Sequence, residues 1–273
     1  MNKSSALGFV GVGNMGGALV RGVLRAGIVE PDRLWVSDID AAKTRRLADE
    51  LKVKVAEGNR DLLGRADTVV LGVKPQTFSA LLDELAPAAE PRHLFISIAA
   101  GVPVRAITRR LGRDARVVRV MPNTPALIGC GAAGIARGGG ATDADLQWAL
   151  EIFNSVGVAV EVQEEEINAV TGLSGSGPAY VFHLVEALTR AGEKAGLAPE
   201  TAAALTRQTL LGAARMVCES GVEPAELRRR VTSPGGTTEA GLKILADADF
   251  LGLIERMVAR ATQRGAELAK MVE

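Results

Sequence analysis

The glycine-rich stretch from Gly11 to Gly16 constrains the fold of this chain more than any other feature. It reads Gly-Val-Gly-Asn-Met-Gly and comes directly after an apolar run at 6–10, which predicts a buried strand. Apolar residues then recur at helical spacing up to Gly27, and a second apolar run at 33–37 predicts another strand. A strand, a GxGxxG turn, a helix and a strand in about 30 residues are typical of a dinucleotide-binding βαβ unit.

Each glycine of this motif has a separate predicted role. Gly11 makes the tight turn, Gly13 lets the backbone approach a pyrophosphate, and Gly16 lets the helix pack closely against the strand. Asp38 closes the second strand, at the position where an acidic side chain accepts hydrogen bonds from ribose hydroxyls. The unit therefore predicts a site for a nicotinamide dinucleotide.

The same alternation of strands and helices continues to residue 162. Further strands are predicted at 67–73, 93–98, 116–121 and 158–162, a strand or hairpin at 129–140, and helices at 41–51, 78–85, 104–111 and 146–156. Apolar strands separated by helices imply a parallel sheet that is covered on both faces. Ligands bind such sheets at the carboxyl ends of the strands. We therefore expect residues 1–166 to form an α/β domain of Rossmann type.

The pattern changes after the acidic run Glu164–Glu166, which we interpret as a solvated connector. A turn at 174–178 ends in a proline placed to begin a helix, and the residues beyond it have helical apolar spacing only. We therefore expect residues 167–273 to form an all-helical domain. Long helices with one apolar face often pair with a second copy of the same chain, so this domain is predicted to dimerise.

A second glycine-bearing turn, Ser233-Pro234-Gly235-Gly236-Thr237-Thr238, lies within the helical part. The proline fixes one backbone angle, the two glycines allow angles closed to other residues, and a helical pattern follows. A helix start with free N–H groups and two threonine hydroxyls holds a small anion, such as a substrate carboxylate. An ordinary capped turn is the alternative interpretation.

Composition argues against several classes of protein. The 273 residues carry no net charge and only 3% are aromatic, which argues against nucleic-acid binding and a membrane-surface role. No run approaches the roughly 18 apolar residues of a membrane span, and the first residues show no signal peptide, so a cytoplasmic protein is expected. Cys130 and Cys218 have no metal-type spacing and are interpreted as free thiols, and the isolated His93 and His183 are interpreted as structural.

The available side chains favour reduction of an imine. The chain has no histidine placed as the base of a hydroxy-acid dehydrogenase, unless His183 serves, and no lysine between Lys74 and Lys194. The β-hydroxyacid dehydrogenases resemble the chain at Gly11–Gly16, but they use a helix lysine that is missing here. A protonated cyclic imine already carries the positive charge that draws a hydride, so hydroxyl and amide groups that orient it would largely suffice.

The chain resembles the pyrroline-5-carboxylate reductases along nearly its whole length. The shared stretches are Gly11-Val12-Gly13-Asn14-Met15-Gly16, Val73-Lys74-Pro75, Ser97-Ile98-Ala99-Ala100-Gly101-Val102, Met121-Pro122-Asn123-Thr124-Pro125-Ala126, Thr171-Gly172-Leu173-Ser174-Gly175-Ser176-Gly177-Pro178-Ala179-Tyr180 and Ser233-Pro234-Gly235-Gly236-Thr237-Thr238. The resemblance implies reduction of 1-pyrroline-5-carboxylate to L-proline by NADPH or NADH, the last step of proline biosynthesis. It also implies a helical dimerisation domain, homodimers that assemble into decamers, and an active site formed between subunits.

The resemblance also implies site residues by position. Residues that match the cofactor site are Val10, Gly11, Gly13, Asn14, Met15, Gly16, Asn59, Val73, Lys74 and Ala100, and residues that match the substrate site are Glu164, Ser233, Gly236, Thr237 and Thr238. This assignment places the substrate carboxylate on backbone N–H groups. It makes Thr238 catalytic, with its hydroxyl in contact with the ring nitrogen.

The sequence departs from many relatives at two positions. Asp38 stands where they have a small or amide residue suited to a ribose phosphate. An acid there repels a 2′-phosphate and favours NADH, although Arg45 and Arg46 could offset the repulsion. Arg230 stands where some relatives have an amide near the substrate, and it either attracts the carboxylate or is a surface charge.

Two alternative functions stay open at this point. One is a reductase of another cyclic imine or of a hydroxy acid, which would keep the same architecture. The other is a non-catalytic dinucleotide sensor that dimerises through its helices. The intact turn from Ser233 to Thr238 argues against the sensor, because a sensor needs no turn that binds a substrate carboxylate.

Overall fold

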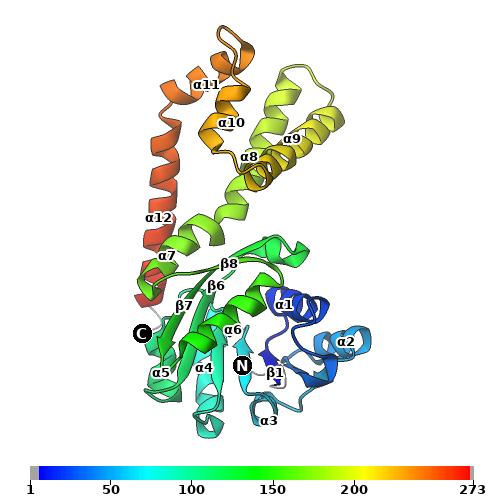
Figure 1. Ribbon diagram of the computed structural model, residues 1–273, viewed down its shortest axis with the longest axis vertical. Coiled ribbons are helices and arrows are strands. Elements are labelled where there is room, and N and C mark those ends of the chain that lie inside the picture. Colours follow the sequence, from blue (N-terminus) through cyan, green and yellow to red (C-terminus); the bar gives the residue numbers. More distant parts are fainter. Residues whose placement is uncertain (1–5, 271–273) are drawn as a thin grey trace. The chain divides into compact units, whose positions relative to one another are not determined.

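The structure, a computed structural model, describes residues 6–270 and contains two compact units. The sheet unit comprises the chain up to Ser176 together with the residues from Ala259 onward, and the helical unit comprises Gly177–Val258. Figure 1 shows a sheet flanked by helices in the first and helices alone in the second. The predicted fold class, a Rossmann-type domain followed by helices, is confirmed. The compact units divide the chain at 176 and again at 258, whereas the sequence pattern divides it once at 166.

The sheet unit contains eight strands in the order β3-β2-β1-β4-β5-β6-β7-β8. Their bounds are β1 Leu7–Val10, β2 Leu34–Ser37, β3 Lys54–Val55, β4 Thr68–Leu71, β5 Leu94–Ser97, β6 Arg116–Met121, β7 Gly131–Gly139 and β8 Gly157–Glu161. The strands from β3 to β6 are parallel, but β7 runs antiparallel to β6, and β8 is parallel to β7. The predicted parallel sheet is therefore confirmed except at one pair of strands, β6 and β7. Only the short loop 122–130 separates β6 from β7, and a parallel pair needs a longer crossover.

Helices cover both faces of this sheet (Figure 1). One layer contains α1 Asn14–Arg25, α2 Ala41–Leu51 and α6 Asp143–Asn154, and the other contains α3 Asn59–Arg65, α4 Pro75–Leu85 and α5 Val104–Leu111. Successive strand residues point to opposite faces, so Phe9 is buried in the first core and Val10 in the second. The sequence pattern predicts neither β3 nor α3. With two and seven residues respectively, these elements are too short to show a clear apolar periodicity.

The chain leaves the sheet through a wide helical turn. Helix α7 (Ile167–Val170) continues directly into a π-helical turn at Thr171–Gly175. Within it the hydroxyl groups of Thr171 and Ser174 donate to backbone carbonyls four residues earlier, at 2.8 and 3.1 Å. The predicted turn at 174–178 is therefore reduced to a bend at Ser176, and the next helix begins at Gly177 with Pro178 in its first turn, as predicted. π-helical turns are rare and occur often at functional sites.

The helical unit buries almost none of its apolar side chains. It contains α8 Gly177–Lys194, α9 Pro199–Glu219, α10 Pro224–Arg230, α11 Thr237–Asp247 and the beginning of α12 Phe250–Lys270. Among its described residues, which cover all of 177–258, only Ala202 is buried. Its large exposed apolar side chains are Val181, Phe182, Leu184, Leu188, Leu197, Leu205, Leu211, Met216, Val217, Val231, Ile244, Leu245, Phe250, Leu251, Leu253 and Ile254.

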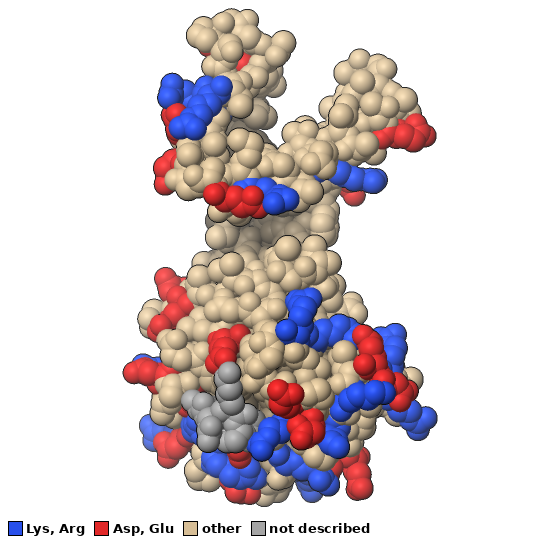
Figure 2. Space-filling model, turned by 45° about the vertical axis from the view of Figure 1, so that its right-hand side comes forward, with Lys and Arg blue, Asp and Glu red and all other residues tan. Residues whose placement is uncertain are grey.

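So large an exposed apolar surface indicates that another protein surface covers these helices. On the face shown in Figure 2, charged side chains crowd over the sheet unit, and the helical unit has long stretches without them. None of the helices described between residues 6 and 270 is long and apolar enough to cross a lipid bilayer.

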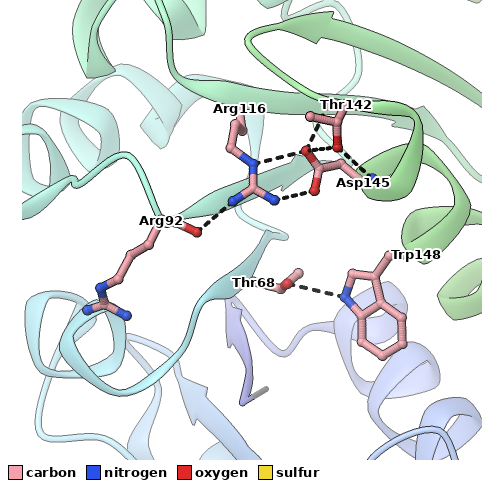
Figure 3. Close-up of polar contacts among 6 residues, drawn as sticks. All are labelled: Thr68, Arg92, Arg116, Thr142, Asp145 and Trp148. Atoms are coloured by element: carbon pink, nitrogen blue, oxygen red, sulfur yellow. Dashed lines mark hydrogen bonds and ion pairs between the residues drawn. The ribbon is translucent and has the colours of Figure 1, made fainter. Parts of the chain in front are cut away.

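A buried carboxylate fixes the start of α6 (Figure 3). Asp145 is fully buried and accepts hydrogen bonds from both the backbone N–H and the hydroxyl of Thr142, at 2.8 and 3.0 Å. Arg116 on β6 forms a two-pronged ion pair with it and donates a further hydrogen bond to the carbonyl of Arg92. Burial raises the pKa of Asp145, but the hydrogen bonds from Arg116 and Thr142 outweigh it and hold the pKa below its ordinary value.

We predict that Asp145→Asn lowers the free energy of unfolding by about 3 kcal/mol at pH 7, because the variant leaves the guanidinium of Arg116 without its counter-charge. The folded-state pKa of Asp145 is lowered, so its stabilising contribution is present above about pH 4 and is lost as the pH falls through the folded value. Thermal unfolding of both proteins, at one protein concentration, should show the difference at pH 7 and a smaller one near pH 3.

Asp143→Asn is the matched control, because the Asp143 side chain is 88% exposed where it pairs with Arg137 at the start of the same helix. Such exposed pairs contribute about 0–1 kcal/mol. Equal losses in the two variants would contradict the special role of the buried carboxylate.

Candidate functional site

The candidate site begins where β1 and β4 end side by side. Gly11 follows β1 with a φ of +88°, a conformation that favours glycine, and a Cβ there would lie 2.8 Å from the backbone of Gly72. The N–H of Gly72 donates to the carbonyl of Val10 at 2.7 Å. The helices that follow β1 and β4 lie on opposite faces of the sheet, so their loops diverge here. Open α/β sheets bind ligands at such a point.

The three glycines of the loop serve different purposes. A Cβ at Gly16 would overlap the carbonyl oxygen of Gly11, so Gly16 permits the close contact between α1 and the loop. A Cβ at Gly13 would meet no atom of the protein within 4 Å, and Gly13 has an ordinary φ of −63°. The packing of the chain therefore does not require glycine at 13, and the missing side chain leaves room for a ligand. Gly13 is also the N-cap of α1 and offers no side-chain cap, so the first N–H groups of α1 can bind an anion.

Asp38 braces this loop from the end of β2. One carboxylate oxygen accepts the N–H of Val12 at 2.8 Å, and the other accepts the N–H of Asp40 at 2.9 Å. The side chain is 8% exposed, and the ammonium of Lys43 lies 4.0 Å away. The carboxylate is therefore largely used within the protein. Its predicted contact with a ribose stays a prediction.

A cavity of about 220 Å³ adjoins the loop between α1 and α2. Its walls include Gly13 and Asn14 from the loop and the basic side chains of Arg21, Lys43 and Arg46. Arg21 is paired with Glu50 at 2.8 Å. Basic side chains and helix N–H groups around one cavity suit a phosphate-bearing ligand, so the residues present fit a dinucleotide cofactor.

The other predicted cofactor residues lie along the same edge of the sheet. Val73 and Lys74 follow β4, with Lys74 exposed as the N-cap of α4. Ala100 is exposed in the loop after the neighbouring strand β5. Asn59 begins α3 and accepts a hydrogen bond from Ser37, the last residue of β2. The structure thus places the cofactor residues predicted from the sequence at the carboxyl ends of four neighbouring strands, β2, β1, β4 and β5.

Glu164 has a structural role that the sequence does not reveal. Its carboxylate accepts the N–H of Val104, at the start of α5, at 2.7 Å, and it pairs with Arg119 at 3.3 Å. The side chain of Arg119 on β6 is 5% exposed; burial lowers its pKa, and Glu164 opposes that effect. Glu164 thus joins α5 to β6. Its predicted contact with a substrate is untested by this geometry and stays a prediction.

The remaining predicted substrate residues form a helix start in the helical unit. Gly236 is the N-cap of α11, its N–H donates to the carbonyl of Ser233 at 3.0 Å, and Gly235 adopts a φ of +69°. The carboxylate of Glu239 accepts the N–H of Gly235 at 2.8 Å. The helix predicted after this turn is therefore confirmed. Thr237 and Thr238 occupy its first turn and are exposed.

Other candidate groups have local partners. His93 is buried between the backbone N–H of Glu90 and the carbonyl of Leu63, at 2.9 and 3.0 Å. Burial, followed by the charge of Arg92, lowers its pKa, so it is held neutral as a structural residue. Arg230 forms an ion pair with Glu226 at 2.8 Å. In the part of the chain that the structure describes, no three His, Cys, Asp or Glu side chains are grouped as a metal site.

Comparison with known proteins identifies similar domains and similar whole chains. Residues 164–268 match a family model described as pyrroline-5-carboxylate reductase dimerisation, and residues 6–101 match one described as NADP oxidoreductase, coenzyme F420-dependent. A pyrroline-5-carboxylate reductase of Pseudomonas aeruginosa is 47% identical over 97% of both chains.

Two solved structures are similar over nearly the whole chain. The pyrroline-5-carboxylate reductase of Coxiella burnetii has a TM-score of 0.93 and 38% identity, and covers 97% of this chain and 99% of its own. The pyrroline carboxylate reductase of Plasmodium falciparum, solved with NADP bound, has a TM-score of 0.84 and 30% identity, and covers 98% of this chain and 100% of its own.

The different purposes of Gly13 and Gly16 lead to a paired prediction. Gly13→Ala should fold with a thermal midpoint close to that of the wild type, because its methyl group meets no protein atom, yet it should weaken dinucleotide binding about tenfold or more. Gly16→Ala should lower the thermal midpoint clearly, because its methyl group overlaps the Gly11 carbonyl. Differential scanning calorimetry and fluorescence titration with NADPH measure the two effects. Unchanged NADPH affinity in Gly13→Ala would contradict the assignment of the loop.

Proposed function

We propose that this chain, which belongs to the pyrroline-5-carboxylate reductase family, reduces 1-pyrroline-5-carboxylate to L-proline with NADPH or NADH. A relative of that name covers 97% of its length, and the glycine-rich loop, the basic cavity and the helix start at Thr237 supply the binding groups that the reaction needs. The observation that carries the proposal is Gly13, whose missing side chain serves no packing within the protein.

The sheet unit holds the cofactor. The loop from Val10 to Gly16 binds the pyrophosphate through backbone N–H groups at the start of α1. Asn59 and Asp38 lie toward the adenosine, and Val73, Lys74 and Ala100 line the site at the ends of β4 and β5. When it is bound, the nicotinamide supplies the hydride.

The turn at the start of α11 holds the substrate. The N–H groups of the first turn, together with Ser233, bind the carboxylate, since a helix N-terminus favours negative charge. Gly236, whose own N–H donates to the Ser233 carbonyl, contributes by leaving room for the substrate. The Thr238 hydroxyl contacts the ring nitrogen and orients the imine. Glu164 is the remaining residue that the family resemblance assigns to the substrate, in addition to its bond with Val104 and its ion pair with Arg119.

A second copy of the chain covers the helical unit. The exposed apolar side chains of α8, α9 and α12 support a homodimer, and each buried side chain of this kind contributes about 1.5–3 kcal/mol. Residues 167–273 are the dimerisation and substrate-binding domain in this proposal, the dimers assemble into decamers, and the active site forms between subunits. The protein acts in the cytoplasm on a small-molecule substrate.

The geometry around Asp38 supports use of NADPH as well as NADH. Its two carboxylate oxygens are already held by backbone N–H groups, and the ammonium of Lys43, 4.0 Å away, offsets part of the repulsion between this carboxylate and a 2′-phosphate. Lys43 and Arg46 in the neighbouring cavity attract one. The preference for NADH inferred from Asp38 alone is therefore weakened by the residues around it.

Thr238→Ala should lower kcat by roughly 10²-fold with 1-pyrroline-5-carboxylate, because the ring nitrogen loses its hydroxyl partner, while the affinity for NADPH stays unchanged. Thr238→Ser keeps a hydroxyl and should recover most of the rate. Steady-state kinetics and NADPH titration measure both properties. Full turnover in Thr238→Ala would remove this residue from the mechanism.

Arg46→Ala should raise the KM for NADPH about tenfold and leave the KM for NADH within twofold, because only NADPH carries the 2′-phosphate. Arg45→Ala is the matched control, since Arg45 is exposed on the same helix but is not part of the cavity wall. Equal changes for both cofactors in Arg46→Ala would show that this guanidinium does not recognise the phosphate.

A further inference from the structure

A chain of side-chain hydrogen bonds runs from the end of β2 to α4. The hydroxyl of Ser37 donates to Oδ1 of Asn59 at 2.8 Å, and Nδ2 of Asn59 donates to a carboxylate oxygen of Glu84 at 2.9 Å. Ser37 also accepts the N–H of Gly11 through its backbone carbonyl at 2.8 Å. These hydrogen bonds therefore connect the amide of Asn59 to the glycine-rich loop on one side and to Glu84 on the other.

Only one residue in this series of hydrogen bonds determines the orientation of the Asn59 amide. The Ser37 hydroxyl can donate to the amide oxygen or accept from the amide nitrogen, so it is satisfied by either orientation. The ionised carboxylate of Glu84 can only accept. If the amide were reversed, its oxygen would face the carboxylate oxygens and a hydrogen bond would become a repulsion. Glu84 therefore selects the orientation seen.

Resting on the function proposed above, we propose that Glu84 is a positioning residue for the cofactor, acting through Asn59. With Nδ2 directed at Glu84, the half-buried amide of Asn59 keeps one N–H and one oxygen lone pair for another partner. Asn59 stands at the start of α3, beside the end of β2, and adenosine ribose binds at this edge in dinucleotide-binding sheets. A fixed amide presents its donor and acceptor to the ribose hydroxyls in one arrangement only.

The packing of α3 on α4 does not depend on the Glu84 carboxylate. Arg60 donates to the backbone carbonyl of Glu84, at 2.9 Å, and this bond survives any change of side chain. Leu62, Leu81 and Leu85 share one buried apolar core. Loss of the carboxylate therefore changes the orientation of the amide without removing the contacts that hold the two helices together.

Glu84→Gln tests the proposal, because glutamine can donate as well as accept and so permits both amide orientations. We expect the KM for NADPH and the KM for NADH to rise about three- to tenfold, since both cofactors carry the adenosine. The kcat and the thermal midpoint should stay close to those of the wild type. Asp83→Asn, one residue away, makes the same change of charge in an exposed ion pair with Arg110 and should alter neither KM.

A double-mutant cycle separates positioning from a general effect on the site. Asn59→Ala should itself raise both KM values, and Glu84→Gln should add nothing in that background. The proposal would be overturned by an unchanged KM in Glu84→Gln. It would also be overturned if Glu84→Gln raised KM equally in the wild-type and the Asn59→Ala backgrounds. Cofactor affinity is also measured by fluorescence titration without substrate, so the inference on Glu84 is tested even if the protein fails to turn over 1-pyrroline-5-carboxylate.

Discussion

The close approach of two loop backbones at the ends of β1 and β4 is the contact on which the candidate cofactor site depends. A Cβ at Gly11 would lie 2.8 Å from Gly72, and a Cβ at Gly72 would lie 2.7 Å from the carbonyl oxygen of Gly11. Because neither residue has a side chain, the loops touch and the N–H of Val12 reaches Asp38. That bond sets the direction in which α1 begins, and with it the direction of its free N–H groups. The absence of side chains at Gly11 and Gly72 therefore helps to position an anion site.

The helical unit differs from the sheet unit, because a single chain leaves most of its apolar side chains exposed. Helices α8, α9 and α12 expose apolar side chains that a stable protein buries, while the sheet unit has two full cores. A second copy that covers these helices would also complete a substrate site at the start of α11. Folding of this unit, assembly and activity would then be linked, so changes on the apolar helix faces would affect all three.

Much of the fold follows from local sequence patterns. The strand, glycine turn and helix at the N-terminus, and the helix start after Gly236, are short-range features with a known chemistry, and the structure has them where they were predicted. The two-residue β3 is too short for a pattern, and the reversed direction of β7 depends on the length of the loop before it. The π-helical turn at Thr171–Gly175 is a turn-like sequence that the structure keeps helical.

Side-chain partnerships were the least predictable part of the site. Asp38 was recognisable as an acid at the end of a strand, but its bond to Val12 spans 26 positions and has no sequence signal. The same holds for Glu84, which lies 25 positions from Asn59, and for Glu164 and Val104. Such partners become neighbours only when the sheet assembles. Sequence patterns therefore predict candidate site residues but not the groups that hold them in place.

The central claim is that this chain transfers a hydride from NAD(P)H to a cyclic imine. The most direct test incubates the purified protein with racemic 1-pyrroline-5-carboxylate and NADPH or NADH, and measures cofactor oxidation and L-proline formation together. The account predicts one L-proline formed for each cofactor oxidised, with turnover from both cofactors. A folded protein that binds the cofactor but forms no L-proline with either one would contradict it.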